Sequence, residues 1–147
     1  MLYTVKITSS DGKDVIQIGK FAEEDKDEIS IISGINVMLD TVDENVRQKS
    51  NAMLAKLTIY GEIRLEVTDK LIDLYNWARN PNQNKWYRTV EIEIKSSGED
   101  VVRRYIFEKM FVVDYKETYD KEDNNCQFEL VLTQKENNLD NIETFDN

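Results

Sequence analysis

The sequence predicts a mainly β protein: a small antiparallel β-barrel or two-sheet sandwich with one α-helix, at about residues 68–79, packed on its side. Over most of the chain apolar and polar residues alternate with a period of two, which is typical of strands with one buried face. One segment, TDKLIDLYNWARNP, departs from that period and has the spacing of an amphipathic helix. The 147 residues suffice for one domain with its own core. We place that domain at residues 1–135.

The first part of the chain is predicted to be strands and turns. Tyr3, Val5 and Ile7 alternate with polar neighbours, and the turn at residues 10–13 lets residues 15–18 pair back as a hairpin. The charged run 23–28 is either a solvated connection or a calcium-binding loop, although it lacks EF-hand spacing. Residues 29–39 form a strand with a bulge or bend near Gly34.

A polar segment, Asp40 to Ser50, follows this strand and is too long for a tight turn. We expect a mobile excursion or an interaction loop there. Its candidate contact residues are Asp40, Asp43, Glu44, Arg47 and Lys49. Residues 51–67 then resume the strand pattern.

The helix has recognisable ends. Thr68 is a suitable N-cap, Asp69 complements the helix dipole, and Asn80-Pro81 stops the helix. The predicted buried stripe, spaced i, i+3, i+4 and i+7, consists of Leu71, Leu74, Tyr75 and Ala78. Trp77, at the edge of this stripe, is expected to pack against a strand or a neighbouring subunit.

Four antiparallel strand segments are predicted after the helix, at residues 90–94, 101–107, 111–115 and 126–132. Cys126 is either a small buried residue or a reactive thiol. The cluster at residues 86–88 (Trp, Tyr, Arg) is either an aromatic ligand platform or packing under the helix. Arg103 and Arg104 are the only adjacent basic pair. Either one of them faces water while the other pairs with an acid, or they form an inter-subunit salt bridge.

The last twelve residues, 136–147, are acidic and lack periodicity, so we expect a flexible tail. Its apolar residues, Leu139, Ile142 and Phe145, could still dock on a partner.

Composition argues against several functions. The net charge of −10 disfavours sequence-specific nucleic-acid binding and contact with anionic membranes. The chain has no histidine, one cysteine and no phosphate-binding glycine loop, so we expect no enzyme, no cofactor and no metal. A carboxylate pair could hydrolyse a glycoside, but no pair among 29 acidic residues is singled out.

The sequence also bears on localisation. It lacks an apolar run of the ~20 residues that a membrane helix needs, so we expect no membrane insertion. The N-terminal residues lack a signal-peptide pattern. We therefore expect cytoplasmic synthesis and assembly, with release as part of a particle as a further option.

Residues 51–134 resemble the tail-tube family of contractile injection machines, which includes phage tail-tube proteins and the haemolysin-coregulated (Hcp) tube proteins of type VI secretion. The resemblance is carried by AMLAKLTIYGEI, TDKLIDLYNWA, YRTVEIEIK, RRYIFEKMFVVDYKETYD and CQFELVLTQKE. It implies a small β-barrel with a helix on its side, and hexameric rings that stack into a hollow tube. In this family the long loop after the early strands reaches across ring interfaces, a role that Asp40 to Ser50 would take here. The implied partners are other copies of the chain and the sheath and baseplate proteins of the same machine.

Two alternatives remain open at this point. One is a capping or baseplate protein built on the same barrel, and the other is a monomeric ligand- or protein-binding β-barrel.

Overall fold

The computed structural model describes residues 1–22, 30–41, 53–79, 87–98, 100–122, 125–134 and 143–146. The strands are β1 (Leu2–Ser9), β2 (Val15–Ile18), β3 (Ile32–Thr41), β4 (Met53–Glu62), β5 (Arg88–Lys95), β6 (Val101–Asp120), β7 (Asn125–Gln134) and β8 (Glu143–Asp146). A short 3₁₀ turn, η2 (Leu65–Val67), leads into the helix α2 (Thr68–Arg79). The predicted class, a mainly β chain with a helix at 68–79, is confirmed.

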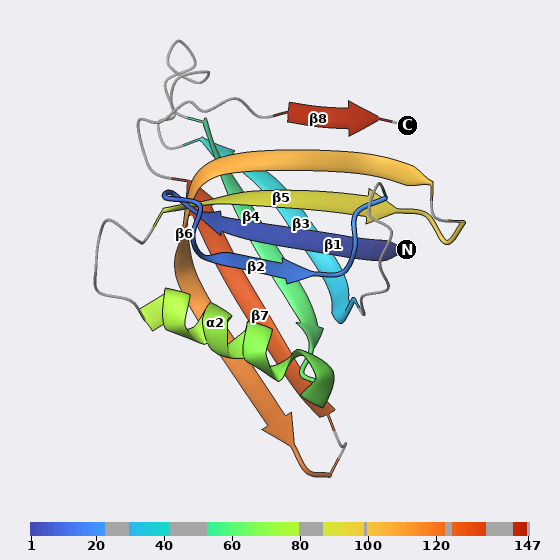
Figure 1. The fold of residues 1–147 in the computed structure, drawn as a ribbon, viewed down its shortest axis with the longest axis vertical. Coiled ribbons are helices and arrows are strands. Elements are labelled where there is room, and N and C mark those ends of the chain that lie inside the picture. The colour runs from blue at the N-terminus through green and yellow to red at the C-terminus, as the bar shows by residue number, and fades with distance from the viewer. Residues whose placement is uncertain are drawn as a thin grey trace.

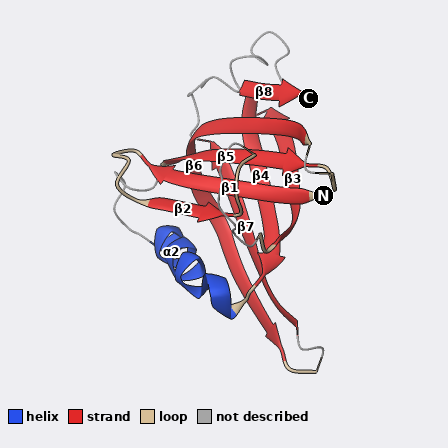
Figure 2. Cartoon of the chain, turned by 45° about the vertical axis from the view of Figure 1, so that its right-hand side comes forward, coloured by secondary structure: helices blue, strands red, loops and turns tan. Residues whose placement is uncertain are grey.

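All strand pairs are antiparallel, and the sheet order is β2-β1-β5-β6-β7-β4-β3, with β8 paired to β6. Figure 1 shows two crossing layers, with β1, β2 and β5 in front and β3, β4 and β7 behind. The helix covers the side below β2, and Figure 2 shows it against the sheet from a second direction.

The 20-residue strand β6 joins the two layers because it bends between its halves. Its first half pairs with β5, and its second half pairs with β7. The bend coincides with a bulge at which Lys109 adopts a positive φ of 56° and the pairing with β5 slips. Gln134 fixes this bulge, since its Nε2 donates to the Glu108 carbonyl (3.2 Å) and its Oε1 accepts from the Ala55 amide (3.0 Å). The sequence predicted two separate strands here, at 101–107 and 111–115. A second register shift follows Val112, and Val113 is half exposed.

The core lies between the layers and under the helix. Its largest members include Ile7, Leu57, Leu74, Ile92, Phe107 and Leu130, all nearly inaccessible to solvent. Gly61 makes room for this packing, because a Cβ at that position would lie 2.5 Å from the Phe128 ring. The bulge predicted at Gly34 is present, as the β3–β4 register shifts between Ile32 and Gly34.

The helix buries a stripe that differs from the predicted one. Leu71, Leu74 and Trp77 are buried, and Ala78 is half-buried. The prediction that Tyr75 faces the barrel is wrong, because its side chain is 50% exposed. Successive helical residues are rotated by about 100°, so a stripe centred on Leu74 leaves Tyr75 at its margin.

Part of the predicted flexible tail is a strand. β8 pairs with the first half of β6, from Arg103↔Asp146 to Ile106↔Glu143. It follows the same edge of β6 on which β7 ends at Met110↔Gln134, so the C-terminal strands cover that edge in succession. The predicted connections at 23–28 and 42–50, together with Asn80-Pro81 and Trp86, lie outside the described residues.

Candidate functional site

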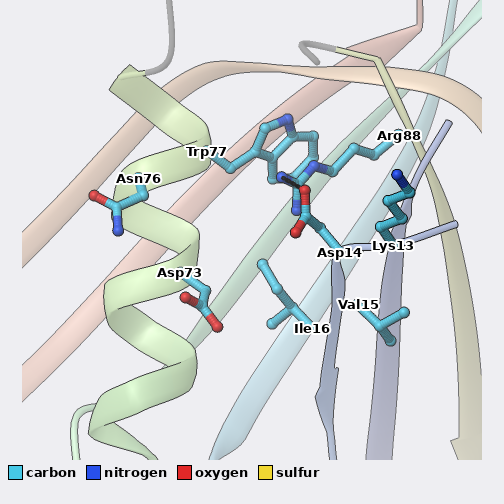
Figure 3. A pocket seen from close by; sticks show the side chains of 8 residues that line it. All are labelled: Lys13, Asp14, Val15, Ile16, Asp73, Asn76, Trp77 and Arg88. Atoms are coloured by element: carbon cyan, nitrogen blue, oxygen red, sulfur yellow. Dashed lines mark ion pairs between the residues drawn. The ribbon is translucent and has the colours of Figure 1, made fainter. Parts of the chain in front are cut away.

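A pocket of about 370 Å³ lies between the β1–β2 turn, the start of β5 and the helix (Figure 3). Its lining residues are Lys13, Asp14, Val15, Ile16, Asp73, Asn76, Trp77 and Arg88. The four charged side chains of the lining, two cationic and two acidic, make the pocket formally neutral in a strongly acidic chain.

Arg88 is placed by the sheet. It is the first residue of β5, held between Ser9 of β1 and Met110 of β6. Alternation puts its side chain on the same face as Val90 and Ile92, which is the core face. At this end of the strand that face is covered by the helix, so the guanidinium lies 5.2 Å from the centre of the Trp77 ring and is only 7% exposed.

The charge of Arg88 is incompletely satisfied by the chain. Its Nη2 lies 4.0 Å from Asp14 Oδ2, beyond hydrogen-bond distance, and its buried Nε has no hydrogen-bond partner in the part of the chain that the structure describes. Burial lowers the pKa of Arg88, and the nearby carboxylates of Asp14, Asp73 and Asp11 partly offset that effect. An arginine remains charged at neutral pH, so the site holds a desolvated cation.

The β1–β2 turn fixes Asp14 at this distance. Ser9 donates from its hydroxyl to Asp11 Oδ1 (2.6 Å) and accepts from the Asp14 amide (2.9 Å). The Ser9 amide in turn donates to the Asp14 carbonyl (2.9 Å). The backbone at Asp14 is therefore held at both its amide and its carbonyl, while its side chain stays 54% exposed and able to rotate.

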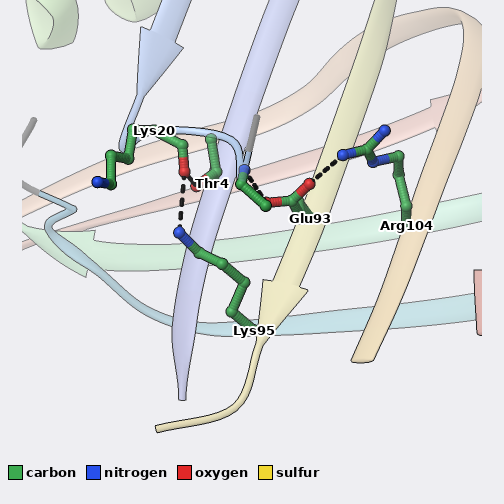
Figure 4. Close-up of polar contacts among 6 residues, drawn as sticks. Thr4, Lys20, Glu93, Lys95 and Arg104 are labelled. Atoms are coloured by element: carbon green, nitrogen blue, oxygen red, sulfur yellow. Dashed lines mark hydrogen bonds and ion pairs between the residues drawn. The ribbon is translucent and has the colours of Figure 1, made fainter. Parts of the chain in front are cut away.

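A second buried charge lies on the opposite face of β5. Glu93 is fully buried, forms an ion pair with Arg104, and accepts from the Ala22 amide (2.7 Å). Figure 4 shows the segment that covers it, in which the Lys20 carbonyl accepts from Thr4 Oγ1 (2.6 Å) and Lys95 Nζ (3.1 Å). This cluster ties the segment after β2 onto β1 and β5.

Another acid, Glu117, accepts hydrogen bonds from two tyrosines on the second half of β6. Tyr115 donates to its Oε1 (2.7 Å) and Tyr119 donates to its Oε2 (2.8 Å). Burial and then the bond to Glu117 raise the pKa of Tyr115, and the bond to Glu117 raises that of Tyr119. The Tyr115 ring also meets Tyr75 of the helix edge-on, with ring centres 6.4 Å apart.

The predicted site residues are partly brought together. Asp40 lies in β3, whereas Asp43, Glu44, Arg47 and Lys49 are outside the described residues. Arg104 makes its ion pair within its own chain, which is the simpler of the two alternatives, and an inter-subunit role for Arg103 stays a prediction.

In the cluster at residues 86–88, Arg88 packs under the helix, as one of the two alternatives predicted. Tyr87 contacts Phe111 edge-on. Cys126 is half-buried and free. The sequence missed the contribution of Asp14 and Asp73 to the pocket, because residues 14, 73 and 88 are far apart in the chain and share no spacing motif.

Within the described ranges, no group of three or more histidine, cysteine or acidic residues is arranged to hold a metal ion. No helix among the described residues is long and apolar enough to span a bilayer.

Comparisons with known proteins show the fold. No protein-family model and no curated protein sequence matches the chain. Among solved structures, Hcp1 from E. coli EAEC 042 is similar over 99% of both chains, with 14% identity and a TM-score of 0.62. A chain of the anti-feeding prophage (AFP) baseplate is similar over 99% of this chain and 93% of its own, with 15% identity and a TM-score of 0.55.

A chain of the PVC sheath–tube complex, from an extracellular contractile injection system, is also similar. The likeness covers 99% of this chain and 90% of that one, with 11% identity and a TM-score of 0.55. The protein therefore has the fold of Hcp and contractile-injection tube proteins, and the resemblance predicted from residues 51–134 is confirmed at the level of the fold.

Proposed function

We propose that this protein is a structural subunit that forms hexameric rings, which stack into the inner tube of a contractile phage-tail-like or secretion machine. The observation that carries the proposal is the near-complete overlap with Hcp1 and with chains of two contractile injection assemblies. The likeness spans both layers and the helix and is not confined to a shared hairpin.

The edges of the sheet support assembly. In the described sheet β2 and β3 are the terminal strands, and each has a neighbour on one side only. Apolar side chains are half exposed on both: Val15 on β2, and Met38 and Leu39 on β3. Unpaired edges with apolar side chains favour pairing with another copy, and closed symmetry would remove the edges without open-ended aggregation.

The proposed partners follow from this role: other copies of the chain, and the sheath and baseplate proteins of the same machine. The role needs no catalysis and no cofactor. We assign ring stacking to the segment Asp40–Ser50 and leave Arg103 as a candidate contact between subunits. Replacing residues 42–50 with a short Gly-Ser link should preserve rings and shorten tubes in electron micrographs, and tubes of normal length would refute the assignment.

We propose that the subunit is synthesised and assembled in the cytoplasm and leaves the cell only as part of a particle. Fractionation of the producing cells tests this, because the soluble cytoplasmic fraction should contain the rings. Subunit found only in the membrane fraction would contradict it.

A capping or baseplate protein of the same fold is the second candidate, because one similar chain belongs to the AFP baseplate structure. Such a protein would form single rings that do not extend.

Size-exclusion chromatography with light scattering tests the assembly. A ring should give about six times the subunit mass of 17.3 kDa, and negative-stain images should then show stacked tubes for a tube subunit or isolated rings for a cap. A monomer at high protein concentration and physiological salt would contradict both and favour the monomeric binding barrel.

A further inference from the structure

The pocket at Arg88 holds a cation that the fold has desolvated and, within the described residues, has paired incompletely. The Cζ of Arg88 lies 5.2 Å from the centre of the Trp77 ring, and both residues are more than nine-tenths buried. The buried Nε of Arg88 has no hydrogen-bond partner among the described residues, and the Asp14 carboxylate is 4.0 Å from its Nη2. An unsatisfied buried donor of this kind destabilises the empty site, and a ligand that supplies an acceptor relieves that cost.

We propose that the pocket formed by the β1–β2 turn, α2 and the start of β5 binds a carboxylate group, with Arg88 as the residue that receives it. A guanidinium is planar and offers its donors in its own plane, and a planar carboxylate accepts two of them side by side. Lys13, on the same wall of the pocket, adds a second cation.

Asp14 acts as the internal competitor of the ligand. It lies near Arg88 without forming a hydrogen bond, and its exposed side chain can rotate toward solvent when a stronger acceptor arrives. Asp73, on the helix wall, also opposes a second negative charge. The site therefore favours a single carboxylate over a multiply charged anion such as phosphate, and removing the Asp14 charge should strengthen binding.

Two sources could supply the carboxylate: a small carboxylic acid in solution, or an Asp or Glu side chain of a second copy of this acid-rich chain, which has 29 acidic residues. The recognition chemistry is the same for both. It does not depend on ring formation, so the pocket can fail or succeed separately from the proposed tube.

The experiment uses Trp77 as the reporter. The chain has two tryptophans, so Trp86→Phe leaves the indole that contacts Arg88 as the only one. The Trp77 emission is followed during titration with sodium acetate, with sodium chloride at matched ionic strength as the reference. We expect a saturable change with acetate alone, a change roughly tenfold weaker or absent in Arg88→Gln, and tighter binding in Asp14→Asn.

Two further variants keep the test independent of folding and net charge. Arg64→Gln removes an exposed arginine paired with Glu62 and should leave acetate binding unchanged. Arg88→Lys retains the positive charge without the planar fork and should bind acetate more weakly than the parent chain. Circular dichroism establishes that each variant is folded.

The second source is tested without acetate. If another copy supplies the carboxylate, the Trp77 emission changes with protein concentration in step with light scattering, and Arg88→Gln abolishes that change. Binding in either arm, together with the gain in Asp14→Asn, supports the proposal. A response to neither acetate nor protein concentration overturns it, as does weaker binding in Asp14→Asn, which would mean that Asp14 itself contacts the ligand.

Discussion

Two buried charges on strand β5 are treated in opposite ways by the fold. Glu93, on the outer face, has an arginine partner and a backbone amide directed at its two carboxylate oxygens. Arg88, five residues earlier and on the core face, has an aromatic ring beneath it, an acid at 4.0 Å and a buried Nε without an acceptor. Burial is similar, 0% and 7% exposed, so the difference lies in the partners.

The difference separates a structural charge from one available to a ligand. The Ala22 amide and Arg104 both contact Glu93, and these contacts join the segment after β2 and the strand β6 to β5. The ion pair of Glu93 is therefore part of the tertiary structure. Arg88 contributes less to the tertiary structure, since its ion pair with Asp14 is long, at 4.0 Å. A buried charge whose partners are complete should be costly to remove, and one whose partners are missing should be cheap to remove.

The largest effect is expected at Glu93. Glu93→Leu leaves Arg104 and the Ala22 amide without their acceptor and should lower the free energy of unfolding by about 3 kcal/mol, toward the lower end for buried pairs because Arg104 is 29% exposed. Urea denaturation followed by circular dichroism measures the change. Glu62→Leu is the matched control, because its pair with Arg64 is half exposed, and it should cost less than about 1 kcal/mol. If both variants lost the same free energy of unfolding, Glu93 would have no special structural role.

The partners of Glu93 also show where sequence reasoning reached its limit. Alternation correctly marked β5 as a strand, but it implied that the polar row Glu91, Glu93 and Lys95 faces solvent. Glu93 and Lys95 are buried because the segment 19–22, more than seventy residues away, crosses over them. A period of two predicts which side chains share one face of a strand, but it cannot predict whether a distant segment of the chain covers that face.

The helix and β6 show the same limit in another form. The helical period gave the correct element at 68–79. The choice between Tyr75 and Trp77 for the buried stripe depends on where β2 and β6 lie against the helix. The bend in β6 depends on a left-handed Lys109, for which the residue type gives no signal. Most strands, the helix and the fold were therefore predictable from the sequence, whereas the continuous β6, the strand β8 and the pocket at Arg88 required the tertiary structure.

Glu117 extends the comparison to a second carboxylate whose oxygens both accept hydrogen bonds. Burial and then the bond to Glu117 raise the pKa of Tyr115, and the bond to Glu117 raises the pKa of Tyr119, so the folded state holds both protons more tightly than the unfolded chain does. Stability from these bonds is complete below the unfolded tyrosine pKa of about 10 and is lost as the pH rises above it.

Urea midpoints should thus fall above about pH 10, and they should fall less steeply in Glu117→Gln, which removes the charge that opposes ionisation. Lysines titrate in both proteins, so the difference between the two curves isolates the tyrosines. Parallel curves would show that the Tyr–Glu bonds do not couple to folding.

A smaller effect is expected from the C-terminal strand. Deleting residues 135–147 removes β8 from the edge of β6 beside Arg104 but leaves the Glu93–Arg104 pair in place. We expect a loss of about 1 kcal/mol, because β8 is short and its bonds exchange with water. Thermal denaturation measures it, and Thr144→Pro, which removes a backbone donor within β8, should reproduce most of the change. If the truncated chain fails to fold, the domain boundary at residue 135 is wrong.

The smallest effect on stability is expected at Arg88 itself. Arg88→Met keeps a flexible apolar side chain over Trp77 and removes a charge that is desolvated, has one loose acid contact at 4.0 Å and has an unpartnered Nε. The lost attraction to Asp14 and Trp77 is then offset by the desolvation that is no longer needed, so the free energy of unfolding should change by less than about 1 kcal/mol in either direction. The measurement is the same urea denaturation used for Glu93→Leu, so that the two buried charges of β5 are compared directly. Asp14→Asn serves as the control, since it weakens the same contact from its exposed side and should also be nearly neutral. A loss at Arg88 as large as that at Glu93 would mean that Arg88 is a structural charge, and the contrast between the two ends of β5 would no longer hold.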